Sequence, residues 1–396
     1  MTDREIFYRH LGLPSFNAMD LEIVKADGIW FYDRTGKKFM DLVSGITVSN
    51  VGHRHPKVIQ AIIEQTDKYL HLNVYGEFIQ SPQVKLAKKL VSLLPETLSN
   101  VFFVNSGSEA IEGALKLAKR YTGRSGIISF YNAYHGSTHG SLSITGNESL
   151  KNAYRPLLPG IRQIEFNNLS HLETITSDTA CVVLETVQAE AGIVSIHQEF
   201  IDCLVKRCRD LKVLILLDDI QMGLGRTGKM FSFEHFGFIP DILALAKALG
   251  AGMPLGAFIS SKEIMDTLAY NPELGHITTF GGHPVSCAAA IAGLDVLLSE
   301  NLLGQVEGKG RILEEKLGHH PGFSAVRRAG LALGIDLKNP EKKEQFMRSA
   351  IGHGAIIDWY MFRPATFRIA PPLTITPDEL EEACQRILAA AHESLE

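Results

Sequence analysis

The central part of the chain alternates between short apolar runs and amphipathic segments. Six apolar runs with the length of strands follow one another between residues 100 and 261: NVFFVN, SGIISF, ACVVLE, VLILLDD, ILALAK and LGAFISS. Runs of this kind are typical of strands that are buried on both faces of a sheet. Segments between them, such as residues 109–121 and 200–212, place apolar side chains at helical spacing. The alternation predicts an α/β fold with a mostly parallel central sheet.

The two ends of the chain have a different pattern. Near the N-terminus, DRTGKK separates two strand-like runs within residues 22–45, which predicts a hairpin turn. The C-terminal part contains helical segments such as DELEEACQRILAAAHESL and strand-like segments such as LALGIDL. We therefore expect a large domain at residues 51–295, and a smaller α+β domain built from residues 1–50 together with residues 296–396.

Composition and charge exclude several classes of function. The chain has 396 residues, of which 45% are hydrophobic and 21% are charged, as in ordinary globular proteins. A net charge of -5 gives no reason to expect a nucleic acid or an anionic membrane as partner. No run approaches the ~18 apolar residues that span a bilayer. The five cysteines are scattered and contain no C-x-x-C, which favours reduced thiols and a cytoplasmic location.

The stretch MGLGRTGKMF, residues 222–231, resembles two nucleotide-binding motifs. From Gly223 it can be read as G-x-G-x-x-G, the dinucleotide fingerprint, or as G-x-x-x-x-G-K, a phosphate-binding loop. A dinucleotide site needs a helix directly after the loop, and Pro240 leaves little room for one. An ATP site needs a Ser or Thr hydroxyl for Mg²⁺ where this chain has Met230. We therefore interpret the stretch as a loop that binds neither nucleotide.

Charged residues follow two of the apolar runs. Asp218 and Asp219 end the run VLILLDD, and ligands of open α/β sheets collect beyond the carboxyl ends of strands. A carboxylate is costly to bury there unless it meets a cation, although a helix cap or a surface turn would also explain the acids. Lys247 follows the run ILALA, and a lysine in apolar surroundings can act as an amine nucleophile toward a carbonyl. A lysine that extends its amine to solvent would fit the same pattern.

The segment FFVNSGSEAIEGALKLA predicts a strand, a turn of small residues and a helix. Ser106 and Glu109 have the spacing of a capping box, and Gly107 and Ser108 open the helix. The unpaired N–H groups at a helix N-terminus bind anions such as phosphate. Helix capping alone would explain the same residues.

These three features together are the parts that a pyridoxal 5′-phosphate site requires. Lys247 follows Asp218 by 29 residues; the lysine would form the Schiff base, and the acid would pair with the pyridinium nitrogen. The chain resembles the class III (ω-type) pyridoxal-phosphate aminotransferases of fold type I, nearest to the ornithine and acetylornithine enzymes. The resemblance extends from GITVSNVGHRHP to FRIAPPLTITPDEL, and its most specific block is residues 216–257.

The resemblance implies how the cofactor is held. It places Lys247 and Asp218 in the catalytic roles, the ring of Tyr134 against the pyridine ring, and Thr279 at the phosphate of a neighbouring subunit. The shared phosphate site implies a homodimer. The cofactor-binding residues that the resemblance implies are Gly107, Ser108, Tyr134, His135, Asp218, Gln221, Lys247 and Thr279.

The resemblance also implies how substrates are bound. Arg368 matches the arginine that binds the substrate α-carboxylate, and Glu190 matches the glutamate that pairs with this arginine when the carboxylate is absent. Ser137 stands where the family usually has an arginine for a distal carboxylate, which leaves the substrate open. Arg363 or Arg54 would have to replace that charge if a dicarboxylate is bound.

We therefore expect a ping-pong aminotransferase that moves the ω-amine of ornithine, acetylornithine or 4-aminobutyrate to 2-oxoglutarate. Its partners would be a small-molecule amino donor and an oxo-acid acceptor. An epimerase or aminomutase of the same family is the alternative, and a non-catalytic protein with the same fold is a third class. The pairs His53 with His55 and His135 with His139 lack accompanying cysteines or acids, so we expect no metal site.

Overall fold

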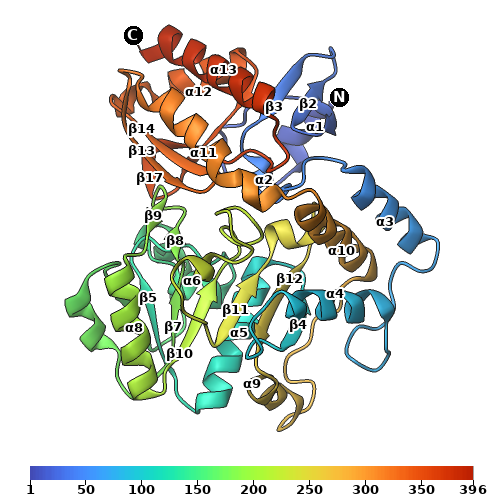
Figure 1. Ribbon diagram of the computed structural model, residues 1–396, viewed down its shortest axis with the longest axis vertical. Coiled ribbons are helices and arrows are strands. Elements are labelled where there is room, and N and C mark those ends of the chain that lie inside the picture. The colour runs from blue at the N-terminus through green and yellow to red at the C-terminus, as the bar shows by residue number, and fades with distance from the viewer. Residues whose placement is uncertain (396) are drawn as a thin grey trace.

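The computed structural model describes residues 1–395. A seven-stranded sheet forms the centre of the protein. The six apolar runs form β4 (Asn100–Val104), β5 (Gly126–Phe130), β7 (Thr179–Leu184), β10 (Leu214–Asp218), β11 (Ile242–Leu245) and β12 (Gly256–Ser260). The strand order is β4-β12-β11-β10-β7-β5-β6. β12 runs antiparallel to β11 and β4, and the other pairs are parallel. The predicted mostly parallel sheet is confirmed (Figure 1).

The edge strand β6 (Ile161–Ile164) has no counterpart in the sequence prediction. Its first three residues are partly exposed, and Ile164 is buried. An edge strand has a neighbouring strand on one side only. Polar residues such as Arg162 and Gln163 can therefore occupy it while their side chains stay partly exposed. The strand therefore lacks the continuous apolar run that identifies its neighbours.

Helices cover both faces of the sheet, as the alternating pattern predicts. Successive residues of a strand point to opposite faces. Leu216 of β10 packs in a core with α5 (Gly107–Thr122), whereas Leu217 packs in a second core with α8 (Gln198–Leu211). Both faces are therefore sealed from water, and the sheet forms a rigid support for side chains at the ends of its strands.

The N-terminal strands and a C-terminal strand share a second sheet. Its order is β1 (Ile23–Asp27), β2 (Trp30–Asp33), β3 (Lys38–Asp41) and β15 (Ala355–Ile356). The antiparallel pair of β2 and β3 confirms the predicted hairpin, and β15 lies parallel to β3. Residues far apart in the sequence are thus joined in one part of the molecule, seen at the top of Figure 1.

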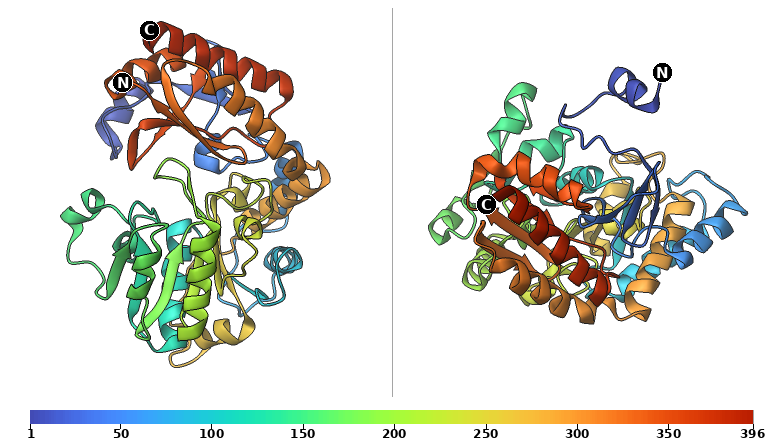
Figure 2. Two further views of the ribbon diagram at one scale, coloured as in Figure 1. Left: turned by 60° about the vertical axis from the view of Figure 1, so that its left-hand side comes forward. Right: turned by 90° about the horizontal axis from the view of Figure 1, so that it is seen from above.

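A third sheet and three helices complete this part, which we call the terminal lobe: β1 to β3 and every element from α11 onward. The strand order is β13 (Phe323–Ala329), β14 (Ala332–Leu337), β17 (Arg363–Ile369) and β16 (Asp358–Tyr360). Figure 2 shows the covering helices α11 (Leu302–Gly318), α12 (Lys343–Gly352) and α13 (Pro377–Leu395). The third sheet lies on the side of the terminal lobe that faces the central sheet. The pair of β14 and β17 therefore lies toward the ends of the central strands (Figure 1).

The remaining elements flank these sheets. α10 (Pro284–Ser299) packs against α3 (Pro56–Thr66) and α4 (Ser81–Ser92) beside the central sheet (Figure 1). The short elements are α1 (Asp3–His10), α2 (Ser44–Thr47), α6 (His139–Ile144), α7 (Glu148–Lys151), β8 (Val187–Gln188), β9 (Val194–Ser195) and α9 (Lys262–Asp266). Among the described residues no single helix is long and apolar enough to cross a membrane, although the bent pair of α10 and α11 meets the length and composition criteria together.

Candidate active site

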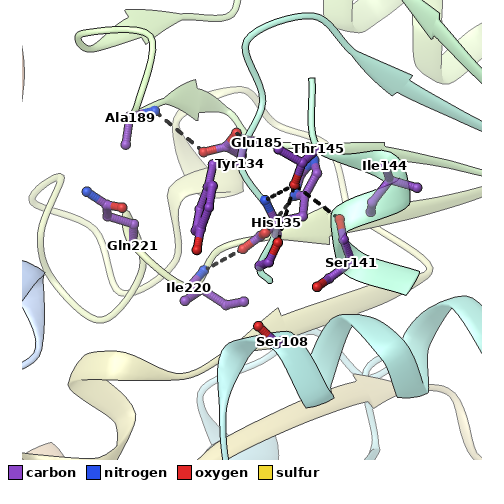
Figure 3. A network of polar contacts seen from close by, with 12 residues as sticks. Ser108, Tyr134, His135, Ser141, Ile144, Thr145, Glu185, Ala189, Ile220 and Gln221 are labelled. Atoms are coloured by element: carbon purple, nitrogen blue, oxygen red, sulfur yellow. Dashed lines mark hydrogen bonds and ion pairs between the residues drawn. The ribbon is translucent and has the colours of Figure 1, made fainter. Parts of the chain in front are cut away.

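A cavity of about 510 Å³ lies at the carboxyl ends of the central strands. The carboxyl ends of parallel strands meet at one edge of a sheet, and ligands of α/β proteins bind there. Residues at or just after the ends of β4, β5, β7, β10 and β11 line this cavity, among them Ser108, Tyr134, Glu185, Asp218 and Lys247. Figure 3 shows the Tyr134, His135 and Glu185 side chains grouped above Ser108, which lies in the first turn of α5.

Asp218 is the last residue of β10, and the side chain of a histidine holds its carboxylate. Its Oδ2 atom lies 2.7 Å from Nδ1 of His135, and its Oδ1 atom accepts a hydrogen bond from the Ile220 N–H at 3.1 Å. Both side chains are buried. A buried carboxylate is tolerated where such donors satisfy it, so the interpretation of Asp218 as a surface turn or a helix cap is not needed. The imidazole fixes the direction in which the carboxylate faces the cavity.

Lys247 extends from the turn that follows β11. It begins the short helix η4 (Lys247–Gly250) with a φ of +48°, in the left-handed region that residues other than glycine adopt infrequently. Its Nζ atom donates a hydrogen bond to Oε1 of Gln221 at 2.8 Å. Burial, and then the positive charge of Arg368, lower the pKa of Lys247 to about 8. The amine is therefore much closer to its neutral, nucleophilic form than an exposed lysine.

Glu185 is a cavity residue that the sequence analysis does not single out. It is buried directly after β7, and its carboxyl oxygens accept hydrogen bonds from the N–H groups of Tyr134 (3.3 Å) and Ala189 (3.4 Å). Burial, and then the charge of Asp218, raise the pKa of Glu185 well above its ordinary value. The sequence does carry a signal for Glu185, because the apolar run ACVVLE ends in an acid just as VLILLDD does.

The N-terminus of α5 faces the cavity, although its capping differs from the prediction. The Ser106 Oγ atom accepts a hydrogen bond from the N–H of Glu109 at 3.2 Å. The carboxylate of Glu109 accepts instead from the backbone N–H (2.7 Å) and the side-chain amide (2.9 Å) of Asn105, so the capping box is not reciprocal. The first N–H groups of a helix have no intrahelical acceptor, and those of Gly107 and Ser108 open this one.

Close backbone approach joins this helix to the segment after β5. A Cβ atom on Gly136 would lie 2.2 Å from Oγ of Ser108, and its φ of +131° also favours glycine. The next residue, Ser137, donates its backbone N–H to the same Oγ atom at 3.3 Å. Its own hydroxyl is exposed and lies 3.1 Å from the Tyr134 hydroxyl. Ser137 therefore presents a neutral polar group beside the cavity.

Arg368 and Glu190 form a buried ion pair. The distance between Nη2 of Arg368 and Oε1 of Glu190 is 2.5 Å, and the guanidinium carbon lies 4.5 Å from the ring centre of Tyr360. Burial, the largest single cause, would lower the pKa of Arg368, but the charges of Glu190, Tyr360 and Asp358 together with the hydrogen bond to Glu190 outweigh it, and the pKa is raised. Among the described residues no hydrogen-bond partner is found for Nε of Arg368. The pair is outside the lining of the cavity, yet the charge of Arg368 acts on Lys247.

Three residues considered in the sequence analysis lie elsewhere in this chain. Thr279 is exposed, and its Oγ1 atom lies 3.5 Å from the hydroxyl of Tyr75. Arg363 forms an ion pair with Asp336 at 2.9 Å. Neither Arg363 nor Arg54 is among the described residues that line the cavity.

The chemistry of these side chains fits pyridoxal 5′-phosphate. A lysine with a lowered pKa suits the aldehyde, and the Asp218 carboxylate suits a pyridinium nitrogen. The glycines at 107 and 136 keep space beside the N-terminus of α5, where a phosphate can accept N–H groups. Within residues 1–395, no group of three or more His, Cys, Asp and Glu side chains is arranged to hold a metal ion.

Comparisons with known proteins show the family to which the chain belongs. Residues 14–391 match the family model for class III aminotransferases. The chain is 38% identical over 383 residues to the acetylornithine aminotransferase of Methanocaldococcus jannaschii, with 93% of each chain covered. It is 37% identical to that of Bacillus subtilis, with 96% and 97% covered. The ornithine aminotransferase of Toxoplasma gondii superposes with a TM-score of 0.91 at 26% identity, covering 99% of this chain and 94% of that one. The chain therefore belongs to the class III aminotransferases, which have fold type I and depend on pyridoxal 5′-phosphate.

Proposed function

We propose that the protein moves the terminal amino group of acetylornithine, ornithine or 4-aminobutyrate to 2-oxoglutarate. The observation that carries this proposal is the buried pair of Arg368 and Glu190 beside the cavity of Lys247 and Asp218. One site must accept two different substrates in turn, and an arginine with an exchangeable partner can serve both. The names of the two microbial relatives support acetylornithine as the first donor to test.

The cofactor supplies an aldehyde that takes up the amino group and a ring that accepts an electron pair. We assign to Lys247 the transfer of the proton at the carbon that bears the amino group. Its lowered pKa allows the neutral amine to accept this proton, and Gln221 orients the Nζ atom through its Oε1 atom. A base whose pKa lies near the working pH is most effective in such a transfer.

We assign to Asp218 the role of keeping the ring nitrogen protonated. His135 holds one oxygen of its carboxylate, so the charge has a fixed direction. Burial favours the uncharged form of Glu185, so no second carboxylate competes with Asp218 for the same cation. Tyr134 would stack its ring on the cofactor, where a flat apolar face suits a π-system.

The phosphate would bind at the first turn of α5, through Gly107 and Ser108. We infer that Thr279 of a second subunit completes this site, because in this chain it is exposed and outside the cavity. Large apolar side chains are exposed around it, including Ile277 and Phe280. Such a patch supports a homodimer interface, since monomeric proteins rarely leave one uncovered.

Arg368 would bind the carboxylate of 2-oxoglutarate in place of Glu190. A bidentate carboxylate can replace the glutamate at the guanidinium, so that the buried charge of Arg368 stays paired. A donor that reacts through its ω-amine brings no carboxylate to this position, so Glu190 would stay paired. Ser137 offers such a donor a hydroxyl rather than a cation at its far end.

The test is a donor screen on the purified enzyme loaded with pyridoxal 5′-phosphate. Each of the three donors is incubated with 2-oxoglutarate, and glutamate is measured. We expect glutamate from at least one of them, with the parallel double-reciprocal lines of a ping-pong reaction. The absence of glutamate together with racemisation of a chiral amino acid would instead identify an epimerase.

We also infer the division of the chain and its location. Residues 51–295 would form the large cofactor-binding domain, and residues 1–50 and 296–396 the small one; the pairing of β3 with β15 supports this division. A cytoplasmic location is supported by the five cysteines, none of which is paired within the described residues.

A further inference from the structure

Arg226 lies at the centre of the glycine-rich loop, residues 222–231. Its side chain has 0% exposure, which is rare for an arginine. As the sequence analysis predicts, no long helix follows the loop directly; the short helix η3 (Ser232–His235) follows it instead. A nucleotide-binding role therefore does not explain why this cation is buried.

The guanidinium of Arg226 binds three segments that are remote in the sequence. Nη1 donates to the carbonyl oxygens of Leu331 (2.9 Å) and Pro371 (2.7 Å). Nη2 donates to Oδ1 of Asn50 (2.5 Å) and Oγ of Ser44 (3.3 Å). These acceptors are neutral, and no ion pair with a carboxylate is found for Arg226 among the described residues. Burial lowers the pKa of Arg226 to about 9, so this arrangement has an energetic cost that the four hydrogen bonds offset.

The backbone of the loop is joined to the same segments. The Leu331 N–H donates to the carbonyl of Arg226 at 3.0 Å, and the Asn50 amide donates to the carbonyl of Leu224 at 3.1 Å. A Cβ atom on Gly330 would lie 2.5 Å from the Arg226 carbonyl oxygen, so the two segments are in close contact. The loop and the terminal lobe therefore fit together on both sides of the Arg226 side chain.

Each segment that Arg226 binds leads to a wall of the active site. Pro371 comes three residues after Arg368 and two residues beyond the end of β17. Leu331 precedes β14, whose Gly334 lies opposite Arg368 in the ladder. The segment from Ser44 to Asn50 contains Val48, which lines the cavity. The loop itself begins four residues after Asp218.

We propose that Arg226 is a positioning residue that sets the place of Arg368 relative to Asp218 and Lys247. It would hold β14 and β17, which pair at Arg368, against the glycine-rich loop that lies between Asp218 and Lys247 in the sequence. A displacement of about 1 Å in a substrate-holding group can lower activity about 100-fold. The proposal rests on the assignment of Arg368 to the substrate carboxylate.

The test compares the binding of glutarate, a dicarboxylate that cannot react, to variants loaded with cofactor. Titration calorimetry gives its dissociation constant, and the visible absorbance of the cofactor reports on the other wall of the site. For Arg226→Gln we expect a dissociation constant about 10- to 100-fold higher with the cofactor absorbance retained. Arg226→Lys would recover part of the loss, because an ammonium cannot bind all four acceptors. Arg368→Gln marks complete loss of the carboxylate site.

Lys309→Met is the matched control. Lys309 is also a buried cation, and its Nζ atom donates to the carbonyl of Leu373 at 2.6 Å, two residues beyond Pro371. It lies on α11 and has no contact of this kind with the glycine-rich loop. We expect Lys309→Met to keep the dissociation constant of the wild-type protein. Equal weakening in both variants, or unchanged binding in Arg226→Gln, would overturn the proposal.

Should Arg226→Gln fail to fold, Asn50→Ala decides the question, because it removes one acceptor of Arg226 and one donor to Leu224. It should weaken glutarate binding in the same direction by a smaller factor, and unchanged binding would refute the proposal. Glutarate binding requires no turnover. A wild-type protein that binds glutarate but makes no glutamate would reject the proposed function only, whereas one that does not bind glutarate would reject the role of Arg226.

Discussion

The guanidinium of Arg368 contacts the carboxylate of Glu190 at 2.5 Å, and both side chains are almost completely buried. A buried ion pair is strongly destabilised when one partner is removed, because the other charge loses its compensation. The pair can therefore open for a substrate that supplies a carboxylate, but it cannot open at low cost for one that does not. Under the proposed function, this difference would make Glu190 the residue that separates the two half-reactions.

The variant Glu190→Gln should shift the enzyme toward substrates with an α-carboxylate. The amide keeps a hydrogen bond to Arg368 but no longer competes as an anion, so the KM for glutamate should fall. For ω-amine donors kcat/KM should fall about 10-fold or more, because Arg368 then stays uncompensated. Single-turnover measurements of the two half-reactions test this. A parallel change in both would show that Glu190 does not act as a switch.

The variant Lys247→Ala should lower turnover by about 10² to 10⁴, the usual contribution of a positioned acid–base group. Lys229→Ala is the matched control, since Lys229 is the exposed lysine of the glycine-rich loop. We expect the control to retain the activity of the wild-type enzyme. Glutamate formation at saturating donor measures both. Loss of activity in the control would point back to a role of the loop lysine.

The lowered pKa of Lys247 predicts how the stability of the cofactor-free protein depends on pH. Below about pH 8 the amine is protonated in both the folded and the unfolded chain, and the cost of burial is fully present. Between about 8 and its ordinary value of 10.5 the unfolded chain binds more protons, so the free energy of unfolding gains from rising pH.

Lys247→Met should remove this dependence. At neutral pH the cofactor-free variant should be more stable than the wild-type protein, by less than about 3 kcal/mol. The difference should shrink as the pH rises above 8, where the folded wild type releases its proton. Urea unfolding of both proteins from about pH 7 to about pH 10 measures it. A difference that does not vary with pH would contradict the assignment of the shift to Lys247.

The variant Ser137→Arg should change the ranking of donors. It would place a cation near the hydroxyl of Tyr134. Under the proposed function, a donor that reacts through its ω-amine would present its far end there. A charge-assisted hydrogen bond of about 1.5–3 kcal/mol should raise kcat/KM about 10-fold or more for acetylornithine relative to a diamine. Ser137→Gln adds length without charge and should leave the ranking unchanged. An unchanged ranking in Ser137→Arg would count against a role of this position in carboxylate selection.

Local patterns in the sequence are sufficient to predict the central sheet and the two catalytic candidates. A strand buried on both faces must be apolar along its length, and a charged residue at its end is conspicuous against that background. This is why Asp218 and Lys247 stand out as a pair from the amino-acid sequence alone. The family resemblance then adds roles for residues such as Tyr134 and Arg368, whose local surroundings carry no such signal.

Other features depend on contacts between segments that are distant in the sequence. β6 is an edge strand whose polar residues hide it. The histidine that holds Asp218 comes 83 residues earlier in the chain, so no spacing rule connects the two. Such pairings form between groups that have no other hydrogen-bond partner once the chain is packed.

The glycine-rich loop combines both kinds of information. Its spacing resembles nucleotide motifs, but Met230 within the loop and Pro240 after it are enough to reject them, because a missing hydroxyl and a helix-breaking proline are both local features. What Arg226 does cannot be inferred from the loop, since its acceptors come from residues 44–50, 331 and 371. Periodicity and end signals specify elements one at a time, whereas burial of a cation is possible only when several segments are packed around it.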